Sequence, residues 1–476
     1  MKVNYIKGSV LGVIVVFGLQ SCQVTNRYKT PEIDTTGLYR EMSLQDTTTI
    51  ADIPWNQYFK DPLLQSYIGE ALQSNYNMLI ASERINQAEA ALGMARAAYF
   101  PELALSAQVN QRRLSSADPL TGMPKDKNTL GYHTENYSLG LVASWEIDVW
   151  GKLNRQKRAK FADMLNSYAG KNLVQTSLIS SVANTYYALM ALDEKLRVTE
   201  DMIVLMQDNL LTMEALKEGG LTTGAGVEQT RAALHNVLTT VPDLKSSIRQ
   251  LENALSVMMG KKPGRIERSS LNKQDVPSLL AYGIPIQMLA KRPDVQQAEF
   301  SFRSAFELTN VAQASFYPAI TLTSGTIGYA TTNTLSQFFK PENLIANIIG
   351  GLTQPIFARK KLITQLKVAK AEQKAALYRF EQAVLMAGQE VSDIMNVYES
   401  SMQKNNNRHI QVDALKKAVE YNQELISAGK ATYLEVITAQ QALLQAQLDQ
   451  ANDRLQQLQA TSDLYRALGG GVYQVQ

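Results

Sequence analysis

Two kinds of hydrophobic pattern alternate along this chain. Apolar residues three or four positions apart recur over long stretches, which predicts helices, and short segments of strict alternation predict strands. The change is sharpest in ARAAYFPELALSA at 95–107, where Leu103, Leu105 and Ala107 begin to alternate just after Pro101. Because the residue before a proline avoids the helical region, we expect a helix that turns directly into a strand at Pro101.

The same junction is found again 217 residues later, in AQASFYPAITLTS at 312–324, where Pro318 takes the place of Pro101. A second pair of segments, EGGLTTGAGVEQTRAAL at 218–234 and SAGKATYLEVITAQQAL at 427–443, aligns without gaps at an offset of 209. A fixed internal repeat of this length predicts two copies of one structural unit. Shorter loops in the second copy account for the difference between the two offsets.

Four strands are expected, at about 102–113, 136–149, 319–329 and 344–354. The clearest is the second, which has an apolar and aromatic face and an opposite face of small, polar and acidic residues that includes Glu146 and Asp148. This alternation fits a soluble sandwich as well as a membrane barrel strand. We expect Glu146 and Asp148 to cap the following junction rather than to face a lumen.

Each pair of strands is followed by two long helices. The stretch from 152 to 218 has no proline and would be about 100 Å long as a helix. The chain breaks near 219–224 and returns with alternating steps of three and four, a coiled-coil seam in which Pro242 predicts a kink. The second copy repeats this over about 358–427, with its break at 428–432 and its return through 433–468.

The resulting domain prediction is a signal peptide at 1–21, a tether at 22–60 and a first repeat at 61–260. A linker at 261–285, a second repeat at 286–468 and a tail at 469–476 complete it. The first repeat should open with a helix from Pro62 to about Tyr99, and the second with one from Ile286 to Ser315.

The N-terminus predicts export. Lys2 and Lys7 precede an apolar run from Val10 to Leu19, which suits a secretory signal and is too short to span a bilayer. The run ends Leu19-Gln20-Ser21-Cys22, which resembles a bacterial lipobox, and Cys22 is the only cysteine in the chain. We expect Cys22 to be acylated as the first mature residue. The alternative is a plain signal peptide followed by an incidental cysteine.

Composition argues against other classes. A formal net charge of +3 is too small to predict a nucleic-acid partner. His133, His235 and His409 have no spacing that suggests a ligand set or triad, and neither a phosphate-binding loop nor a nucleophile motif is present. We therefore expect no enzyme, no cofactor and no metal site.

Four strands cannot close a barrel, and open strand edges are too costly in lipid. If the strands span a membrane, several chains must close one barrel together, and the long helices would continue the same tube. The pattern thus favours a passive conduit. A soluble periplasmic coiled-coil structural or adaptor protein remains the alternative from another class.

Several segments carry a family resemblance: Cys22 in its lipobox, ARAAYFP, ASFYP, WEIDVWGKL (145–153), NALSVMMGKKPG (253–264), IPIQMLAKRPDVQQAE (284–299) and YLEVITAQQALLQAQ (433–447). With these the whole mature chain resembles the outer-membrane factors, the TolC-like channels, and is most similar to their lipoprotein branch in drug and metal efflux. Arg292-Pro293-Asp294 is the most telling segment.

The resemblance implies a mainly α fold with four transmembrane β-strands per chain, assembled as a homotrimer. It implies a twelve-stranded barrel in outer-membrane lipid, a lipid anchor, and a periplasmic α-helical barrel closed at its far tip. It further implies partners: a periplasmic adaptor (membrane-fusion) protein and an inner-membrane pump of the RND type. A duct for type I protein secretion is an alternative within this class.

The resemblance also assigns roles to individual residues. The adaptor-docking tips would be Gly219, Gly220, Leu221 and Thr222 in the first copy and Ala428, Gly429, Lys430 and Thr432 in the second. Glu435 would face the closed aperture, where a ring of three carboxylates favours cations. A second acidic ring would fall near Thr438, which is neutral here, and Glu435 could instead be a solvated helix charge. Pro101, Pro318, Trp150, Gly151 and Pro355 would mark the junctions of periplasmic helix and membrane barrel.

Overall fold

The computed structural model describes residues 26–34, 38, 50–113, 133–275, 291–332, 334–428, 430 and 432–472. The signal peptide, Cys22 and Gly429 lie outside these residues, as does much of the tether and the linker. The chain forms two compact units. The strand unit comprises Met1–Pro31, Asn86–Leu165 and Glu299–Tyr378, and the helical unit comprises Glu32–Ile85, Asn166–Ala298 and Arg379–Gln476.

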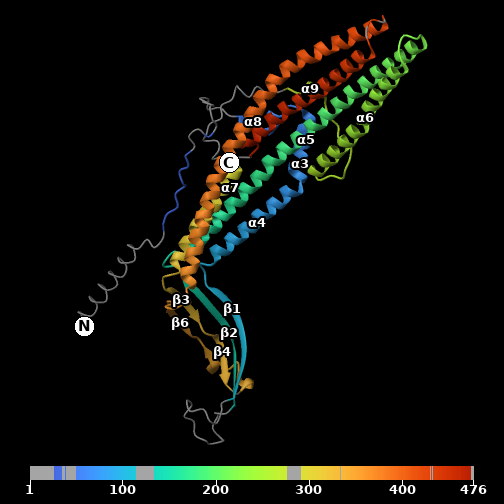
Figure 1. The fold of residues 1–476 in the computed structure, drawn as a ribbon. Helices are drawn as coiled ribbons and strands as arrows, with labels where there is room; N and C mark the ends of the chain where they lie inside the picture. Colours follow the sequence, from blue (N-terminus) through green and yellow to red (C-terminus); the bar gives the residue numbers. More distant parts are fainter. Residues whose placement is uncertain are drawn as a thin grey trace. The chain divides into compact units, whose positions relative to one another are not determined.

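The long helices form two hairpins of identical length (Figure 1). Helix α5 (Lys152–Glu218) and helix α8 (Lys361–Ser427) each have 67 residues, and helices α6 (Gly224–Met258) and α9 (Tyr433–Ala467) each have 35. Every one of these helix ends in the second copy lies 209 positions after its counterpart in the first. The predicted mainly α fold with duplicated hairpins is therefore confirmed.

The shorter helices differ from expectation. The helix expected from Pro62 to Tyr99 is divided into α3 (Pro62–Ser74) and α4 (Tyr76–Ala97). Asn75 separates them, because its side-chain oxygen accepts hydrogen bonds from the backbone of Asn77 and Met78 and so starts a new helix. Helix α7 (Pro293–Ala314) begins with a proline at its first position, later than the expected Ile286. Helix α6 continues through Pro242.

Short elements complete the chain: α2 (Trp55–Tyr58) and the 3₁₀ turns η1 (Ile50–Asp52), η2 (Leu271–Lys273), η5 (Leu335–Gln337) and η6 (Pro341–Asn343). The main core of the helical unit combines α3, α5, α6, α8 and α9, with Leu64, Tyr186, Leu255 and Tyr465 almost fully buried.

Asp61 fastens the linker to this core. One carboxylate oxygen caps α3 through the Leu63 amide at 2.9 Å, and the other accepts from Tyr186 (2.9 Å), Ser269 (2.5 Å) and Gln274 (2.7 Å). Burial alone would raise the pKa of Asp61, but these hydrogen bonds hold it below its ordinary value. The residues after α6 are thus held in place through an ionised carboxylate.

The strand unit contains one antiparallel sheet (Figure 1). Its strands are β1 (Glu102–Arg113), β2 (His133–Ile147), β3 (Ala319–Ser324), β4 (Ile327–Thr332), β5 (Leu344–Ile345) and β6 (Ile348–Thr353). Strand β2 pairs with β1 on one side and with β3 and β4 on the other, while β3 pairs with β6 and β4 with β5. The four expected strands are therefore four ribbons, of which the third and fourth are each interrupted.

A β-bulge causes the interruption of the third ribbon. Thr323 lies opposite Ser144 and Ile327 lies opposite Leu141, so the third ribbon has one residue more than β2 over this interval. The hydroxyl of Ser324 accepts a hydrogen bond from the Ala143 amide at 2.6 Å, which replaces a ladder bond. The alternation pattern does not reveal the bulge because residues 323–326 are all small.

The pairing register gives the sheet one apolar face, because directly opposed residues share a face. Leu105 lies opposite Leu141, which lies opposite Ile327 in the next ribbon. By the same registers this face carries Leu103, Val109, Tyr137, Leu139, Trp145, Ile147, Ile320, Leu322, Tyr329, Leu344, Ile348 and Leu352. The opposite face is mostly small or polar, with Ser106, Ser138, Gly140 and Thr321 among its members.

Gly140 and Gly328 lie opposite each other at a point of close backbone approach. A Cβ atom on Gly328 would lie 2.3 Å from the Leu139 carbonyl oxygen, and one on Gly140 would lie 2.6 Å from that of Ile327. Glycine in a strand marks either a bend or a close approach of two backbones, and Gly140 is of the second kind. A Cβ atom on Gly350, by contrast, would have its nearest neighbour 4.0 Å away.

Replacing Gly328 with alanine is therefore expected to lower the amount of folded protein several-fold, because the methyl group overlaps the neighbouring strand. Gly350→Ala is the matched control and should fold like the wild type. Heat-modifiable mobility on gel electrophoresis measures the folded fraction of both variants. Equal folded fractions would contradict the close approach.

Candidate functional site

The turn between α5 and α6 is the first hairpin tip. The Gly219 amide donates to Ala215 at 3.0 Å and the Leu221 amide donates to Leu216 at 2.8 Å, which closes the end of α5. Gly220 has a φ of 74°, a conformation that favours glycine. Beyond it, Leu221 is 73% exposed. The tip is a tightly bonded turn that presents an apolar side chain.

The second tip, between α8 and α9, uses the same bonds 209 positions later. The Ala428 amide donates to Glu424 at 3.1 Å and the Lys430 amide donates to Leu425 at 2.8 Å. Lys430 thus takes the place of Leu221, so one tip presents an apolar residue and the other a cation.

The two tips pack against each other within the helical unit. Met213, Val227, Ile426 and Val436 form a small buried cluster to which α5, α6, α8 and α9 each contribute one residue. A Cβ atom on Gly226 would lie 3.0 Å from the Tyr433 ring, so the absence of a side chain at Gly226 permits this approach. The helix ends that carry the two predicted tips are therefore packed together.

Glu435 and Thr438, the proposed aperture residues, are both exposed on the first turns of α9. The Glu435 carboxylate accepts a hydrogen bond from the Thr432 amide at 2.7 Å. This is the reach-back bond of a capping box. Glu435 therefore has a structural role at the start of α9, and the Thr432-x-x-Glu435 spacing is the sequence signal that could have revealed it.

Exchanging Glu435 for glutamine separates this structural role from a charge role, because glutamine can accept the same capping bond. If three Glu435 carboxylates line the aperture, the variant should lose several-fold of its cation-over-anion permeability ratio while its stability stays close to that of the wild type. Single-channel recording measures the ratio. The control is Glu424→Gln, which removes a nearby exposed carboxylate, and unchanged selectivity of Glu435→Gln would reject the charge role.

The helix-to-strand junctions are fixed by side chains that bind backbone carbonyls. The Trp145 indole donates to the Tyr99 carbonyl at 2.9 Å, just before Pro101. In the second copy the Gln354 amide donates to the Phe316 carbonyl at 3.0 Å, just before Pro318. Each bond ties the start of one strand to the end of its partner.

The first strand-to-helix junction is capped by the two acidic residues of β2 and its extension. Asp148 accepts from the amides of Leu153 (3.0 Å) and Asn154 (2.8 Å), and Glu146 forms an ion pair with Lys152 at 2.7 Å. The expectation that Glu146 and Asp148 cap this junction is confirmed. Gly151, with a φ of 74°, makes the turn.

Trp150 joins the two copies at this level. Its indole donates to the Pro318 carbonyl at 2.8 Å, and its ring lies 5.0 Å from that of Tyr317. The junction residues Trp150, Gly151 and Pro318 are therefore close together. Pro355 lies with them along a small cavity of about 170 Å³, whereas Pro101 is exposed at the other edge of the sheet.

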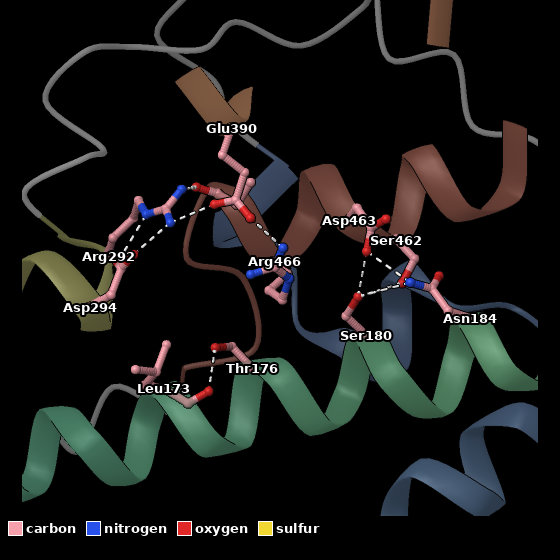
Figure 2. A network of polar contacts seen from close by, with 11 residues as sticks. Leu173, Thr176, Ser180, Asn184, Arg292, Asp294, Glu390, Ser462, Asp463 and Arg466 are labelled. Carbon is pink, nitrogen blue, oxygen red and sulfur yellow. Dashed lines mark hydrogen bonds and ion pairs between the residues drawn. The ribbon is translucent and has the colours of Figure 1, made fainter. Parts of the chain in front are cut away.

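The Arg292-Pro293-Asp294 segment joins three helices of the helical unit (Figure 2). The buried Arg292 guanidinium bonds to Asp294 (2.7 Å), to Glu390 of α8 (2.6 Å) and to the Ala467 carbonyl at the end of α9 (2.7 Å). Glu390 also pairs with Arg466. Burial alone would raise the pKa of Asp294, but Arg292 lowers it below its ordinary value.

Within the residues that the structure describes, no group of three His, Cys, Asp or Glu side chains is arranged to hold a metal ion. His409 contacts Gln450 through Nδ1 at 3.0 Å. Among the described helices, none combines the length and the apolar composition that a membrane span requires.

The family model of outer membrane efflux proteins matches residues 67–261 and 284–470. The chain therefore belongs to the outer membrane efflux protein family. It is 28% identical over 448 residues to the pyoverdine export outer membrane protein OpmQ of Pseudomonas putida, covering 93% of this chain and 94% of OpmQ. It is 26% identical over 421 residues to the probable outer membrane lipoprotein SilC of Salmonella typhimurium, covering 88% of each.

A solved structure has the same fold. The outer-membrane channel OprN superposes with a TM-score of 0.85 at 22% identity, covering 94% of this chain and 99% of OprN. The two stretches matched by the family model correspond to the two copies seen in the structure, one containing α5 and α6 and the other α8 and α9.

Proposed function

We propose that this chain is the outer-membrane channel subunit of a tripartite efflux system and conducts drugs, other toxic small molecules or metal ions passively. The observation that carries the proposal is the sheet: four antiparallel ribbons with a continuous apolar face and a mostly small and polar face. An apolar outer face and a polar inner face are what a barrel strand in lipid requires.

The free edges of the sheet support a homotrimer. Among the described residues, β1 pairs only with β2, and β6 pairs only with β3. Since open edges are costly in lipid, β6 of one chain would pair with β1 of the next. Three chains of four ribbons would then close a twelve-stranded barrel.

The hairpins would form the periplasmic part, a helical barrel whose tips dock onto a periplasmic adaptor and, through it, an RND-type inner-membrane pump. The two tips would supply this contact with Leu221 and Lys430. These residues differ in chemistry but occupy equivalent positions in the two turns. Acylated Cys22 would anchor the mature N-terminus in the outer membrane, as the name of SilC indicates for that relative.

Deletion of the gene, followed by complementation, tests this function. The deletion strain should become several-fold more susceptible to a panel of dyes, antibiotics and metal salts, and the complemented strain should recover. Unchanged susceptibility together with loss of a secreted protein would instead favour a type I secretion duct. Release of the protein from membranes by alkaline carbonate would favour a soluble periplasmic coiled-coil protein.

A further inference from the structure

The two copies repeat their junction contacts under two fixed shifts. A residue near the helix-to-strand junction of the first copy has its counterpart in the second copy 217 positions later. A residue near the strand-to-helix junction has its counterpart 209 positions later. The pair Leu103 and Ala143 becomes Ile320 and Leu352, which are also directly opposite each other. The donor Trp145 and its acceptor Tyr99 become Gln354 and Phe316, which are also hydrogen-bonded. The duplication therefore holds at the level of single contacts.

A second set of contacts lies at the seam between the copies. There the strand-to-helix side of copy one meets the helix-to-strand side of copy two: β2 pairs with β3, and Trp150 binds Tyr317 and Pro318. Within one chain this seam occurs only once. The complementary surfaces, the strand-to-helix side of copy two and the helix-to-strand side of copy one, lie at the two outer edges of the sheet.

Both outer surfaces are exposed and apolar. Ile356 is 98% exposed, Phe357 is 86% exposed and Phe100 is 73% exposed. Arg359 lies two residues after Phe357 and is also exposed. Arg359 and Lys360 have φ values of 48° and 62°, a strained conformation for residues other than glycine. Lys360 corresponds to Gly151, so the second junction keeps the turn of the first without its glycine.

We propose that Arg359 of one chain lies over the Phe100 ring of a neighbouring copy and donates to that copy's Pro101 carbonyl. Arg359 is the second-copy counterpart of Trp150, 209 positions later. Phe100 and Pro101 are the first-copy counterparts of Tyr317 and Pro318, 217 positions earlier. The proposed contact between two chains is therefore equivalent to the Trp150 contact inside one chain. The inference rests on the proposed homotrimer and specifies how its chains join.

Arginine at the position equivalent to Trp150 is compatible with this contact. Like the tryptophan indole, the arginine guanidinium is planar and carries N–H donors, and it stacks on aromatic faces. The retained left-handed turn at Lys360 starts α8 in the way that Gly151 starts α5.

The same shifts give the strand register across the chains. The opposed pair Ser144 and Thr323 predicts Thr353 opposite Ser106 of the neighbour, and Ile147 with Ile320 predicts Ile356 opposite its Leu103. Thr353 and Ser106 both belong to the polar face. Leu103 lies on the apolar face, which the exposed, apolar Ile356 would extend. The register thus continues both faces around the ring, as a head-to-tail interface that closes on itself must.

Cysteine crosslinking tests the contact directly. The double variant Phe100→Cys with Arg359→Cys, oxidised in membranes and denatured, should migrate as covalent dimers and trimers. Trp150→Cys with Tyr317→Cys should crosslink within one chain and keep the mass of a monomer. Phe100→Cys with Phe339→Cys, a pair of equally exposed aromatic positions, should give no covalent oligomer.

The outcomes separate this inference from the proposed function. Trimers that are extracted intact from the outer membrane but give no Phe100–Arg359 crosslink overturn the inference alone. Absence of any trimer overturns the proposed function itself. As a second measurement, Arg359→Ala should lower the temperature at which trimers dissociate, while Arg359→Trp should restore it, since tryptophan makes this contact at position 150. An alanine variant as heat-stable as the wild type would contradict the contact.

Discussion

Replacing Arg292 with alanine is expected to destabilise the helical unit by about 3 kcal/mol, because it leaves Asp294 and Glu390 as partly buried carboxylates without their shared cation. It also removes the bond that holds the end of α9 at Ala467. Chemical denaturation in detergent, followed by circular dichroism, measures the change. Arg197→Ala is the control: the Arg197 side chain is more than half exposed, and its loss should cost less than about 1 kcal/mol.

The same variant should change the response to acid. The pKa of Asp294 is lowered in the folded protein, so its contribution to stability is present above the unfolded pKa and is lost as pH falls through the folded one. The difference in free energy of unfolding between the wild type and the Arg292→Ala variant should therefore shrink below about pH 4. Equal stability of Arg292→Ala and Arg197→Ala at neutral pH would contradict the role of this segment.

The second large effect is expected at the first tip. Leu221→Asp should abolish efflux, with susceptibility rising to that of the deletion strain, because it places a charge on the apolar residue that the tip presents. The amount of trimer in the outer membrane should stay unchanged. Growth on dyes and antibiotics, with the protein quantified in membrane extracts, measures both.

Leu335→Asp is the matched control, since Leu335 is also an exposed leucine but belongs to the loop of the strand unit. In the proposed topology this loop faces away from the adaptor, so efflux should persist. Loss of efflux in both variants, or in neither, would contradict docking through the tips.

The hairpins could be predicted from the sequence because the residues that end each helix are neighbours in the chain. The breaks at Gly219-Gly220 and at 428–432 end long helical patterns, and Pro101 and Pro318 separate a helical from a strand spacing. The structure places helix and strand ends within a few residues of these signals.

The missed features depend on contacts between distant residues or on backbone atoms. At the bulge, the side-chain oxygen of Ser324 accepts a bond in place of a backbone carbonyl. Arg292 bonds to Glu390, which lies 98 positions later in the chain. The junction bonds of Trp145 and Trp150 go to carbonyl groups, which every residue has, so no pattern of side chains could identify them. The break at Asn75 was local, but its neighbours kept a helical spacing that hid it.

The central claim is that four ribbons of each chain form one third of a membrane barrel. The mass of the protein extracted from outer membranes by mild detergent, measured by light scattering with the detergent contribution subtracted, tests it most directly. The account predicts a species with three times the mass of one mature chain. A species with the mass of a single chain would contradict it, because a sheet with two open edges cannot remain in lipid.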